Sequence, residues 1–428
     1  MKNLWPKLRG MEKLEFIALL GLVFSFPLFE TPKTILFVAY VMLWVINHVR
    51  RHEWGGRWNA WDTVITLWLL GSIAIAIHAA KHGLCYKGLW DYLRFIVLCW
   101  LLIRSDFSKQ GYQLLLGMVL ISTMLALLQG YFVMYLLPPP VHSVPALELH
   151  AVGQVNHSAI YLILTWGLAL SLLFAYWKQI SLTWKMIGIL LLIILGQGLI
   201  IGASRACVGM MGGLMILWGG LIWPRVRVLS VLVGVGLILS LGAIWVTKPY
   251  IVSKVSYRAW EFSHNHMPTH RSRLRRMAYL AWLQKPIFGW GARNFRQLHY
   301  DQVQEWAIKR YGYFDQYAYY MWEVGKPMNP GHAHNLYFNT LAEGGLAGLL
   351  PLLAFLILWA IWLWKHYPRA DADALAWALW GASLNAFLIT VIIGWVNTTL
   401  HHEHALLALL LMGLAVSYGK KSYNLILS

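Results

Sequence analysis

A Gly-His-Ala-His-Asn motif, which contains His332, His334 and Asn335, precedes a long apolar run near the end of the sequence. Histidine titrates near neutral pH, so a histidine at a membrane entrance can take a proton from a hydroxyl nucleophile. We expect His334 to be this catalytic base, with His332 and Asn335 binding the same substrate. The alternative role for the motif is hydrogen bonding that caps the start of the following helix.

Four arginines lie close together upstream of that motif, and guanidinium groups bind phosphate oxygens in bidentate fashion. This property makes arginine a natural ligand for a pyrophosphate. We expect Arg273 to be catalytic and its neighbours to bind substrate. The alternative for most of them is a basic patch that faces water or lipid headgroups. The neighbours are Arg271, Arg275 and Arg276.

Arg205 lies between two apolar runs, in the sequence Gly-Ala-Ser-Arg-Ala, with almost no polar loop around it. An arginine near the membrane interior is costly, so it usually faces a cavity or a partner. We therefore predict a catalytic role for Arg205 beside the arginine cluster. The alternative is that its side chain extends to the headgroups or pairs with a helix end.

Three further polar sites are weaker candidates. Glu343 is a carboxylate within an apolar helix and is costly unless it is paired; it is expected to bind substrate, or else to hold Arg205 or the loop in place. His157 begins an apolar segment and is a candidate for a sugar site, although capping by Asn156 is the favoured reading of this stretch. The His-His-Glu-His run at 401–404 lacks the zinc spacing, which needs histidine where Leu406 stands. No metal site and no cofactor are predicted.

The elements that carry these residues are predicted to be membrane helices. The chain has 428 residues, of which 59% are hydrophobic and only 12% charged, with a mean hydropathy of +0.56. Apolar runs of about 20 residues recur, the length that crosses a bilayer core. The fold class is therefore all-α and polytopic, with about 12 transmembrane helices. The expected segments are 14–29, 33–49, 63–80, 90–104, 113–137, 157–177, 184–203, 206–223, 227–247, 335–364, 376–397 and 403–419.

Placing both ends in the cytoplasm puts most lysines and arginines of the short loops on the cytoplasmic side, as the positive-inside rule requires. The chain then divides into nine helices (1–247), a large outer loop (248–333) and three helices (334–428). The loop holds 13 lysines and arginines against five acidic residues, a net charge of +8. This surplus suits an anionic ligand, or simple association with headgroups. Aromatic residues between 311 and 322 predict amphipathic helices on the membrane.

Taken together, these motifs resemble the bacterial O-antigen ligase and polymerase superfamily, most closely the lipopolysaccharide O-antigen ligase. The resemblance rests on the Ser-Arg pair at Arg205, an arginine-led helix from Arg273, a P-x-x-G-x-G turn from Pro286 to Gly291, the H-x-H-N motif, and E-x-G at Glu343. It implies a GT-C-like, metal-independent, inverting glycosyltransferase of the bacterial inner membrane whose active site faces the periplasm. Arg205 and Arg273 would neutralise the leaving group, and His334 would be the general base.

The resemblance implies two substrates: a glycan donor linked to undecaprenyl pyrophosphate, and a lipid A–core acceptor. Membrane lipids are further partners, and no nucleic acid partner is expected. One large late loop favours the ligase over a polymerase of the same superfamily, which often has two comparable outer loops. A non-enzymatic transporter of lipid-linked glycans is the other alternative. Transporters usually carry charged residues near the membrane midplane, whereas here the ionisable candidates gather at one face.

Overall fold

Every regular element that the computed structural model describes is a helix. The structure describes residues 10–136, 147–202, 204–222, 231, 233–239, 242, 270–312 and 331–427. Within these ranges, seven helices are by length and composition able to cross a membrane. The prediction of an all-α, multi-pass membrane protein is therefore confirmed, whereas the count of twelve crossings and the GT-C-like topology stay predictions.

The helices begin and end near the expected boundaries. All of the expected apolar segments except 227–247 coincide with a described helix, and that segment lies largely outside the described residues. The helices of the first half are α1 Met11–Ser25, α2 Glu30–Arg51, α3 Ala60–Lys81, α4 Leu89–Arg104, α5 Lys109–Leu136, α6 Val155–Tyr176, α7 Leu182–Ile201 and α8 Arg205–Ile216, which continues as the π-helical turn Leu217–Ile222. The later ones are α11 His270–Gln284, α12 Tyr300–Tyr311, α14 Leu336–Lys365, α15 Ala374–Leu388 with the π-helical turn Ile389–Ile393, and α16 His402–Leu427.

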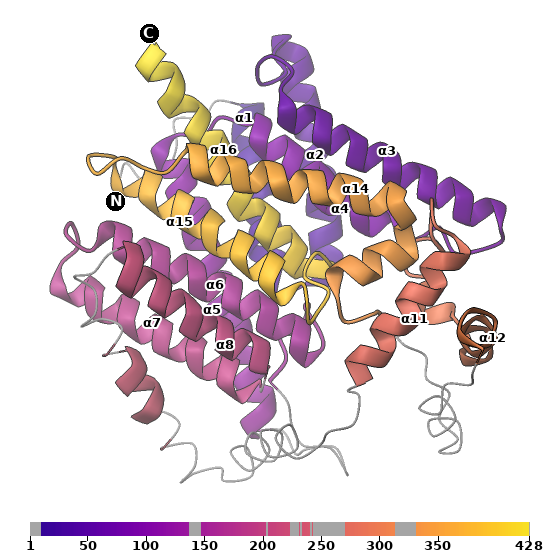
Figure 1. Ribbon diagram of the computed structural model, residues 1–428. Coiled ribbons are helices and arrows are strands. Elements are labelled where there is room, and N and C mark those ends of the chain that lie inside the picture. Colours follow the sequence, from indigo (N-terminus) through magenta and orange to yellow (C-terminus); the bar gives the residue numbers. More distant parts are fainter. Residues whose placement is uncertain are drawn as a thin grey trace.

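Helices that are far apart in the sequence lie side by side in the bundle (Figure 1). α14 packs along α3, α15 packs along α6, and α16 packs against α4, α6 and α15. α6 is the most enclosed of the seven membrane-length helices, with 89% of its apolar window buried. The last two helices of the chain thus surround a helix of the first half.

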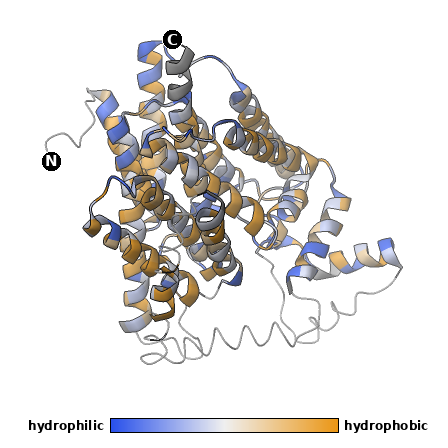
Figure 2. Cartoon of the chain, turned by 60° about the vertical axis from the view of Figure 1, so that its left-hand side comes forward, coloured by the Kyte–Doolittle hydropathy of each residue, from blue (hydrophilic) through white to orange (hydrophobic). Residues whose placement is uncertain are grey.

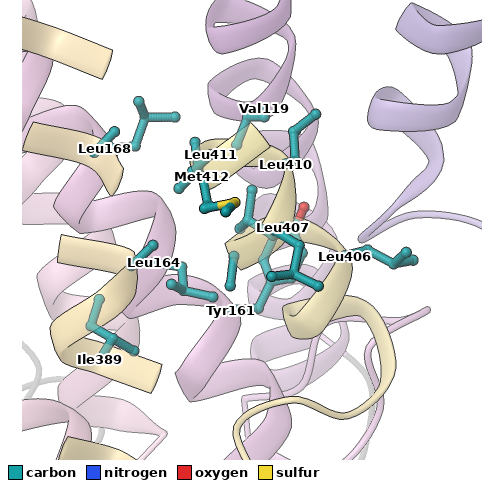
Figure 3. Close-up of a cluster of buried hydrophobic side chains, with 14 of the residues drawn as sticks. Val119, Tyr161, Leu164, Leu168, Ile389, Leu406, Leu407, Leu410, Leu411 and Met412 are labelled. Carbon is teal, nitrogen blue, oxygen red and sulfur yellow. The ribbon is translucent and has the colours of Figure 1, made fainter. Parts of the chain in front are cut away.

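The core between these helices is formed by close-packed aliphatic side chains (Figure 3). Leu407, Leu410 and Leu411 of α16 are buried against Val119 of α5 and Tyr161 of α6. Lipid tails are as apolar as leucine, so helices in a bilayer associate through van der Waals packing instead of the hydrophobic effect. The close fit of these side chains therefore fixes the positions of α6 and α16, which carry histidines at their first turns.

A buried ion pair also positions the start of α16. Lys33 of α2 pairs with Glu403, and the two side chains are 3% and 5% exposed. Removing either partner would leave an uncompensated charge in an apolar environment, which is strongly destabilising. The pair therefore fixes the backbone between His402 and His404.

α14 is divided by a break at Gly345, where the backbone is left-handed with φ +56°. Glycine adopts this conformation without the steric cost that a Cβ imposes. The break separates a short first arm, which follows the His-Ala-His-Asn motif, from the long second arm that packs along α3. The first arm is thereby placed beside the described part of the loop.

The described part of the loop, residues 270–312, folds as two α-helices joined by a turn and the short 3-10 helix Phe295–Gln297. The apolar face of α11 carries Leu274 and Ala278, which are buried against Ala307 of α12 and against Ala333 and Ala342. Figure 2 shows hydrophobic residues over most of the bundle and hydrophilic residues toward the helix ends. α11 and α12 are helices whose apolar faces are buried against each other and against Ala333 and Ala342, and the expectation that loop helices lie on the membrane stays a prediction. The aromatic residues from Tyr313 to Trp322 lie outside the described residues.

Candidate active site

Four main-chain hydrogen bonds join the turn at 285–291 to the break in α14. Two amides of the turn donate to carbonyls of α14, and two amides of α14 donate to carbonyls of the turn. The bonds run from Gly291 N to Glu343 O (2.7 Å), Trp290 N to Ala342 O (3.0 Å), Leu346 N to Pro286 O (2.9 Å) and Ala347 N to Ile287 O (2.8 Å). A broken helix leaves main-chain groups without their helical partners, and in a membrane protein another segment must satisfy them. The predicted P-x-x-G-x-G turn is confirmed as a turn, and it supplies these partners.

Two glycines allow the turn and the helix to approach so closely. Gly289 has φ +62°, and a Cβ added to it would lie 2.5 Å from the carbonyl carbon and oxygen of Glu343. A Cβ added to Gly345 would lie 2.4 Å from the carbonyl oxygen of Ile287. A side chain at either position would therefore push the loop away from α14.

The side chain of Glu343 also holds the loop. It is buried, with 5% of the residue exposed, and its two oxygens accept hydrogen bonds from Phe295 N (3.2 Å) and Asn339 Nδ2 (3.1 Å). Hydrogen bonds to both oxygens offset part of the cost of burying a carboxylate. These contacts support the alternative that Glu343 positions the loop, and its predicted contact with substrate stays a prediction.

Arg293 and Asn294 attach the loop to the start of α4, and the sequence analysis identified neither. Arg293 forms an ion pair with Asp91, which also accepts a 2.7 Å hydrogen bond from Arg94. The amide of Asn294 bonds both main-chain groups of Cys85, at 2.8 Å and 3.2 Å. The one sequence feature that could have indicated them is their position just after the Gly-rich turn.

Asn335 is the N-cap of α14, so the capping alternative is confirmed for this residue. Its Oδ1 accepts a 2.9 Å hydrogen bond from Phe338 N, and its Nδ2 donates a 2.8 Å hydrogen bond to Trp395 O. The residue is fully buried. Asparagine at an N-cap satisfies a main-chain donor that the helix cannot. Because both ends of the amide are occupied, these contacts favour a positioning role, and substrate binding by Asn335 stays a prediction.

His332 and His334 are joined by a hydrogen bond that assigns different roles to the two rings. The main-chain N–H of His334 donates to His332 Nδ1 at 3.2 Å. Burial first, and then the neighbouring His334 and His157, lower the pKa of His332 to about 3, so its ring is neutral near pH 7. A neutral ring that accepts at Nδ1 carries its proton on Nε2 and is there a donor. The assignment of the base to His334 is therefore the one that this geometry favours.

Six histidines from three distant segments of the chain form one cluster. Around His157, at the first turn of α6, the ring centroids of four others lie within 6 Å, and His334 lies 4.1 Å from His332. The four are His404 (5.1 Å), His402 (5.2 Å), His332 (5.5 Å) and His401 (5.7 Å). The sequence does not predict this cluster, because the spacing of the run at 401–404 matches no local motif and its partners are far away along the chain.

The expectation that Asn156 caps this helix is wrong. The N-cap of α6 is Gln154, and no side chain makes a capping hydrogen bond there. Asparagine is favoured at the N-cap, the last residue before the helix with non-helical backbone angles. Asn156 already lies inside the first turn of α6.

Strained backbone surrounds the histidine cluster. Among the described residues, five that are not glycine have a positive φ. Two of these, His334 (φ +48°) and His402 (φ +50°), belong to the cluster, and Gln154 (φ +30°) lies just before His157. Such conformations cost on the order of 1–3 kcal/mol each and persist where the surrounding structure enforces them, often at functional sites. The bundle therefore holds these three residues in place against a local cost.

Arg205 and Arg271 form the cationic part of the site. Burial lowers the pKa of Arg271, and the positive charge of Arg205 lowers it further. The charge of Arg271 contributes in turn to the lowered pKa of His332. The two arginines, one at the start of α8 and one in the first turn of α11, are thus close enough to repel each other and to act on the histidine cluster. Adjacent like charges of this kind favour an anionic ligand.

The remaining arginines of α11 have other surroundings. The guanidinium of Arg276 lies 5.0 Å from the ring centroid of Tyr311, so it links α11 to α12. The side chains of Arg273 and Arg275 are half-buried. The catalytic role predicted for Arg273 and the substrate contacts predicted for Arg275 and Arg276 stay predictions, and Arg271 is coupled electrostatically to Arg205 and His332.

The helices and this site define a multi-pass membrane protein with a cationic, histidine-lined centre where several helices begin. Residues 190–353 match a family model described as O-antigen ligase. The match confirms, over these residues, the resemblance to the O-antigen ligase and polymerase superfamily, and it spans Arg205, the turn, the His-Ala-His-Asn motif and Glu343. No curated protein matches the chain.

Proposed function

We propose that the protein is an O-antigen ligase that transfers a glycan from undecaprenyl pyrophosphate to a hydroxyl of lipid A–core. The observation that carries this proposal is the convergence of Arg205 and Arg271 with the His332–His334 pair. All four belong to the first turns of helices or to the residues just before them. The positive ends of helix dipoles add to the arginine charges, which favours a pyrophosphate at this position.

In the proposed reaction, the oxygen of the acceptor hydroxyl attacks the anomeric carbon of the donor sugar. The bond between that carbon and the pyrophosphate oxygen breaks, and its electron pair leaves with the pyrophosphate. Attack from the opposite side inverts the configuration. Arg205 and Arg271 stabilise the developing negative charge, as a metal ion does in many other transferases. The reaction therefore needs no metal ion.

His334 takes the proton of the acceptor hydroxyl in this scheme. The hydrogen bond from its main-chain N–H to His332 fixes its backbone, which has a left-handed φ of +48°. Glu343 and the turn at 285–291 hold the loop against α14, so that α11 keeps Arg271 beside His332. Positioning of this kind is a large part of enzymatic rate enhancement.

The location that suits this reaction is the periplasmic face of the bacterial inner membrane, where the loop at 248–333 would cover the donor. A polymerase of the same superfamily is the second candidate, because the family match covers a region that both activities share. A polymerase would use a second glycan on undecaprenyl pyrophosphate as its acceptor in place of lipid A–core.

The test uses the purified full chain in proteoliposomes with a glycan on undecaprenyl pyrophosphate, lipid A–core and a chelator. The expected product is glycosylated lipid A–core, formed in the presence of the chelator. Longer glycans on undecaprenyl pyrophosphate, with lipid A–core unchanged, would show a polymerase instead. Movement of the donor across the bilayer without transfer would overturn the proposal of an enzyme.

A further inference from the structure

Three rings of the histidine cluster bring their nitrogen atoms together around one point. His157 of α6, His401 and His402 each offer one ring nitrogen, and these atoms all lie within 4.8 Å of one another. Three atoms so spaced lie at most about 3 Å from their common centre, so movements of less than about 1 Å would reach the ~2.1 Å distance of a zinc–imidazole bond. Such shifts are within the range of small changes in side-chain torsion.

The site has polar atoms that the protein itself does not satisfy. The Nδ1 atoms of His157 and His401 are buried and have no hydrogen-bond partner among the described residues, and the same is true of Nδ1 of His404, whose Nε2 contacts the carbonyl of Thr398 at 3.0 Å. Buried polar atoms in native proteins almost always have partners, so these exceptions point to a water molecule, an ion or another ligand at the site. A ligand that accepts electron pairs from several neutral imidazoles at once is a metal ion.

We propose that His157, His401 and His402 bind a divalent transition-metal ion of the zinc class. Imidazole nitrogen suits zinc, copper and nickel, whereas magnesium and calcium prefer oxygen ligands. Three protein ligands leave a fourth position open, as in zinc sites that also bind water or a further ligand. The sequence did not predict this site, because His157 is far from His401 and His402 along the chain.

The surroundings of the three ligands support a formed site. Close packing of α16 on α6 fixes the helices that carry His157 and His402, and His401 directly precedes α16. The buried Lys33–Glu403 pair fixes the residue next to His402. His404 lies 5.1 Å from His157 between ring centroids and is the nearest further imidazole. Neither Arg205 nor Arg271 is one of the three ligands, so metal binding does not replace their proposed role.

The test is titration of Zn²⁺ into the full chain, purified in detergent with an affinity tag that contains no histidine. Isothermal titration calorimetry and elemental analysis after desalting should show one ion per chain. His401→Ala should weaken binding by at least about tenfold, since loss of even a ligand's supporting partner costs 10–100-fold. His299→Ala, which changes an exposed histidine of the loop, should leave binding unchanged.

Two results would overturn the proposal: no zinc binding by the wild-type protein, or equal binding by wild type and His401→Ala. If His401→Ala does not fold, the absorption spectrum of Co²⁺ in the wild-type protein replaces it, and a spectrum without tetrahedral nitrogen coordination would count against the site. Because the measured quantity is metal binding, a failure here is distinct from a failure of glycan transfer. Glycan transfer in a chelator tests the proposed enzyme mechanism, whereas the zinc titration tests the metal site.

Discussion

The main-chain amide of Gly291 donates a 2.7 Å hydrogen bond to the carbonyl of Glu343, so the loop completes the hydrogen bonding of a broken membrane helix. The contact joins two motifs that the sequence shows as separate. It also links the arginines of α11 to the histidines before α14 through one short, rigid path. The consequences of disturbing that path can be measured.

Gly289→Ala should separate the loop from α14. The new Cβ would lie 2.5 Å from the carbonyl of Glu343, and the position also has a positive φ. We expect a loss of at least about 2 kcal/mol in unfolding free energy and loss of most glycan transfer. Gly312→Ala is the matched control, because Gly312 has φ +73° but nothing within 4 Å of its Cβ position. Denaturation in mixed micelles should show a loss of about 1 kcal/mol for the control; equal losses in the two variants would remove the steric argument.

Arg293→Gln should loosen the other attachment of the loop. It removes the ion pair with Asp91, whose side chain is 10% exposed and keeps Arg94 as a partner. We expect about 1 kcal/mol of destabilisation and faster cleavage of the loop by chymotrypsin. Arg296→Gln changes an exposed arginine close to Arg293, and chymotrypsin should cleave this variant at the wild-type rate. Unchanged cleavage of Arg293→Gln would show that this pair does not hold the loop.

His334→Ala should abolish transfer without affecting membrane insertion. The variant removes the proposed base but keeps the main-chain N–H that contacts His332. Loss of a general base typically costs 10²–10⁴-fold in rate. Transfer to lipid A–core is the measurement, and His299→Ala is the control. If His334→Ala transferred glycan at the wild-type rate, His334 would not be the general base.

Arg205→Lys and Arg271→Lys should each reduce transfer more than about tenfold, because a point charge cannot replace a bidentate guanidinium. The two changes together should cost less than the product of the single effects, since both groups act on one pyrophosphate. Arg310→Lys, at an exposed position of α12, serves as the control. Activity that survives Arg205→Lys would favour contact of Arg205 with headgroups.

The stability of the bundle should fall in acid through Asp373. Burial raises the pKa of this carboxyl, but hydrogen bonds from Lys109 (2.6 Å) and Tyr418 (2.7 Å) outweigh burial and hold the pKa below its ordinary value. The folded state therefore binds this proton less readily than the unfolded state. The stabilisation is present above about pH 4 and is lost as the pH falls through the folded-state pKa. Asp373→Asn should flatten the decline of stability between about pH 4 and 3, and Asp371→Asn, at an exposed position, should not. If the stability of Asp373→Asn fell in acid as steeply as that of the wild type, Asp373 would be excluded as the cause.

The helices could be predicted because their signal is local. A run of apolar residues long enough to cross a bilayer leaves the backbone no other way to satisfy its hydrogen bonds, so α6 and α15 are visible in the sequence. The break within α14 was not predicted, because Gly345 resembles any other glycine until its partner is known. That partner, Ile287, lies in the loop and is identified only by the fold.

The candidate site was predicted in part for the same reason. His332 and His334 were found from their local pattern, and Arg205 from the cost of placing a charge between apolar runs. The proximity of His157 to His401 depends on how α6 and α16 pack, which a single sequence does not encode in any short motif. Arg293 was missed because nothing beside it in the sequence indicates that Asp91 is its partner.

The spread of the histidine cluster along the chain also determines when the site can exist. A ribosome completes α6 with His157 long before it reaches His401, and the last ligand-bearing segment begins only at α16. A chain that stops before that helix contains the turn, the loop and the arginines but cannot assemble the cluster. The histidine centre therefore forms only after α16 has been synthesised and inserted, so a chain that lacks α16 lacks the centre.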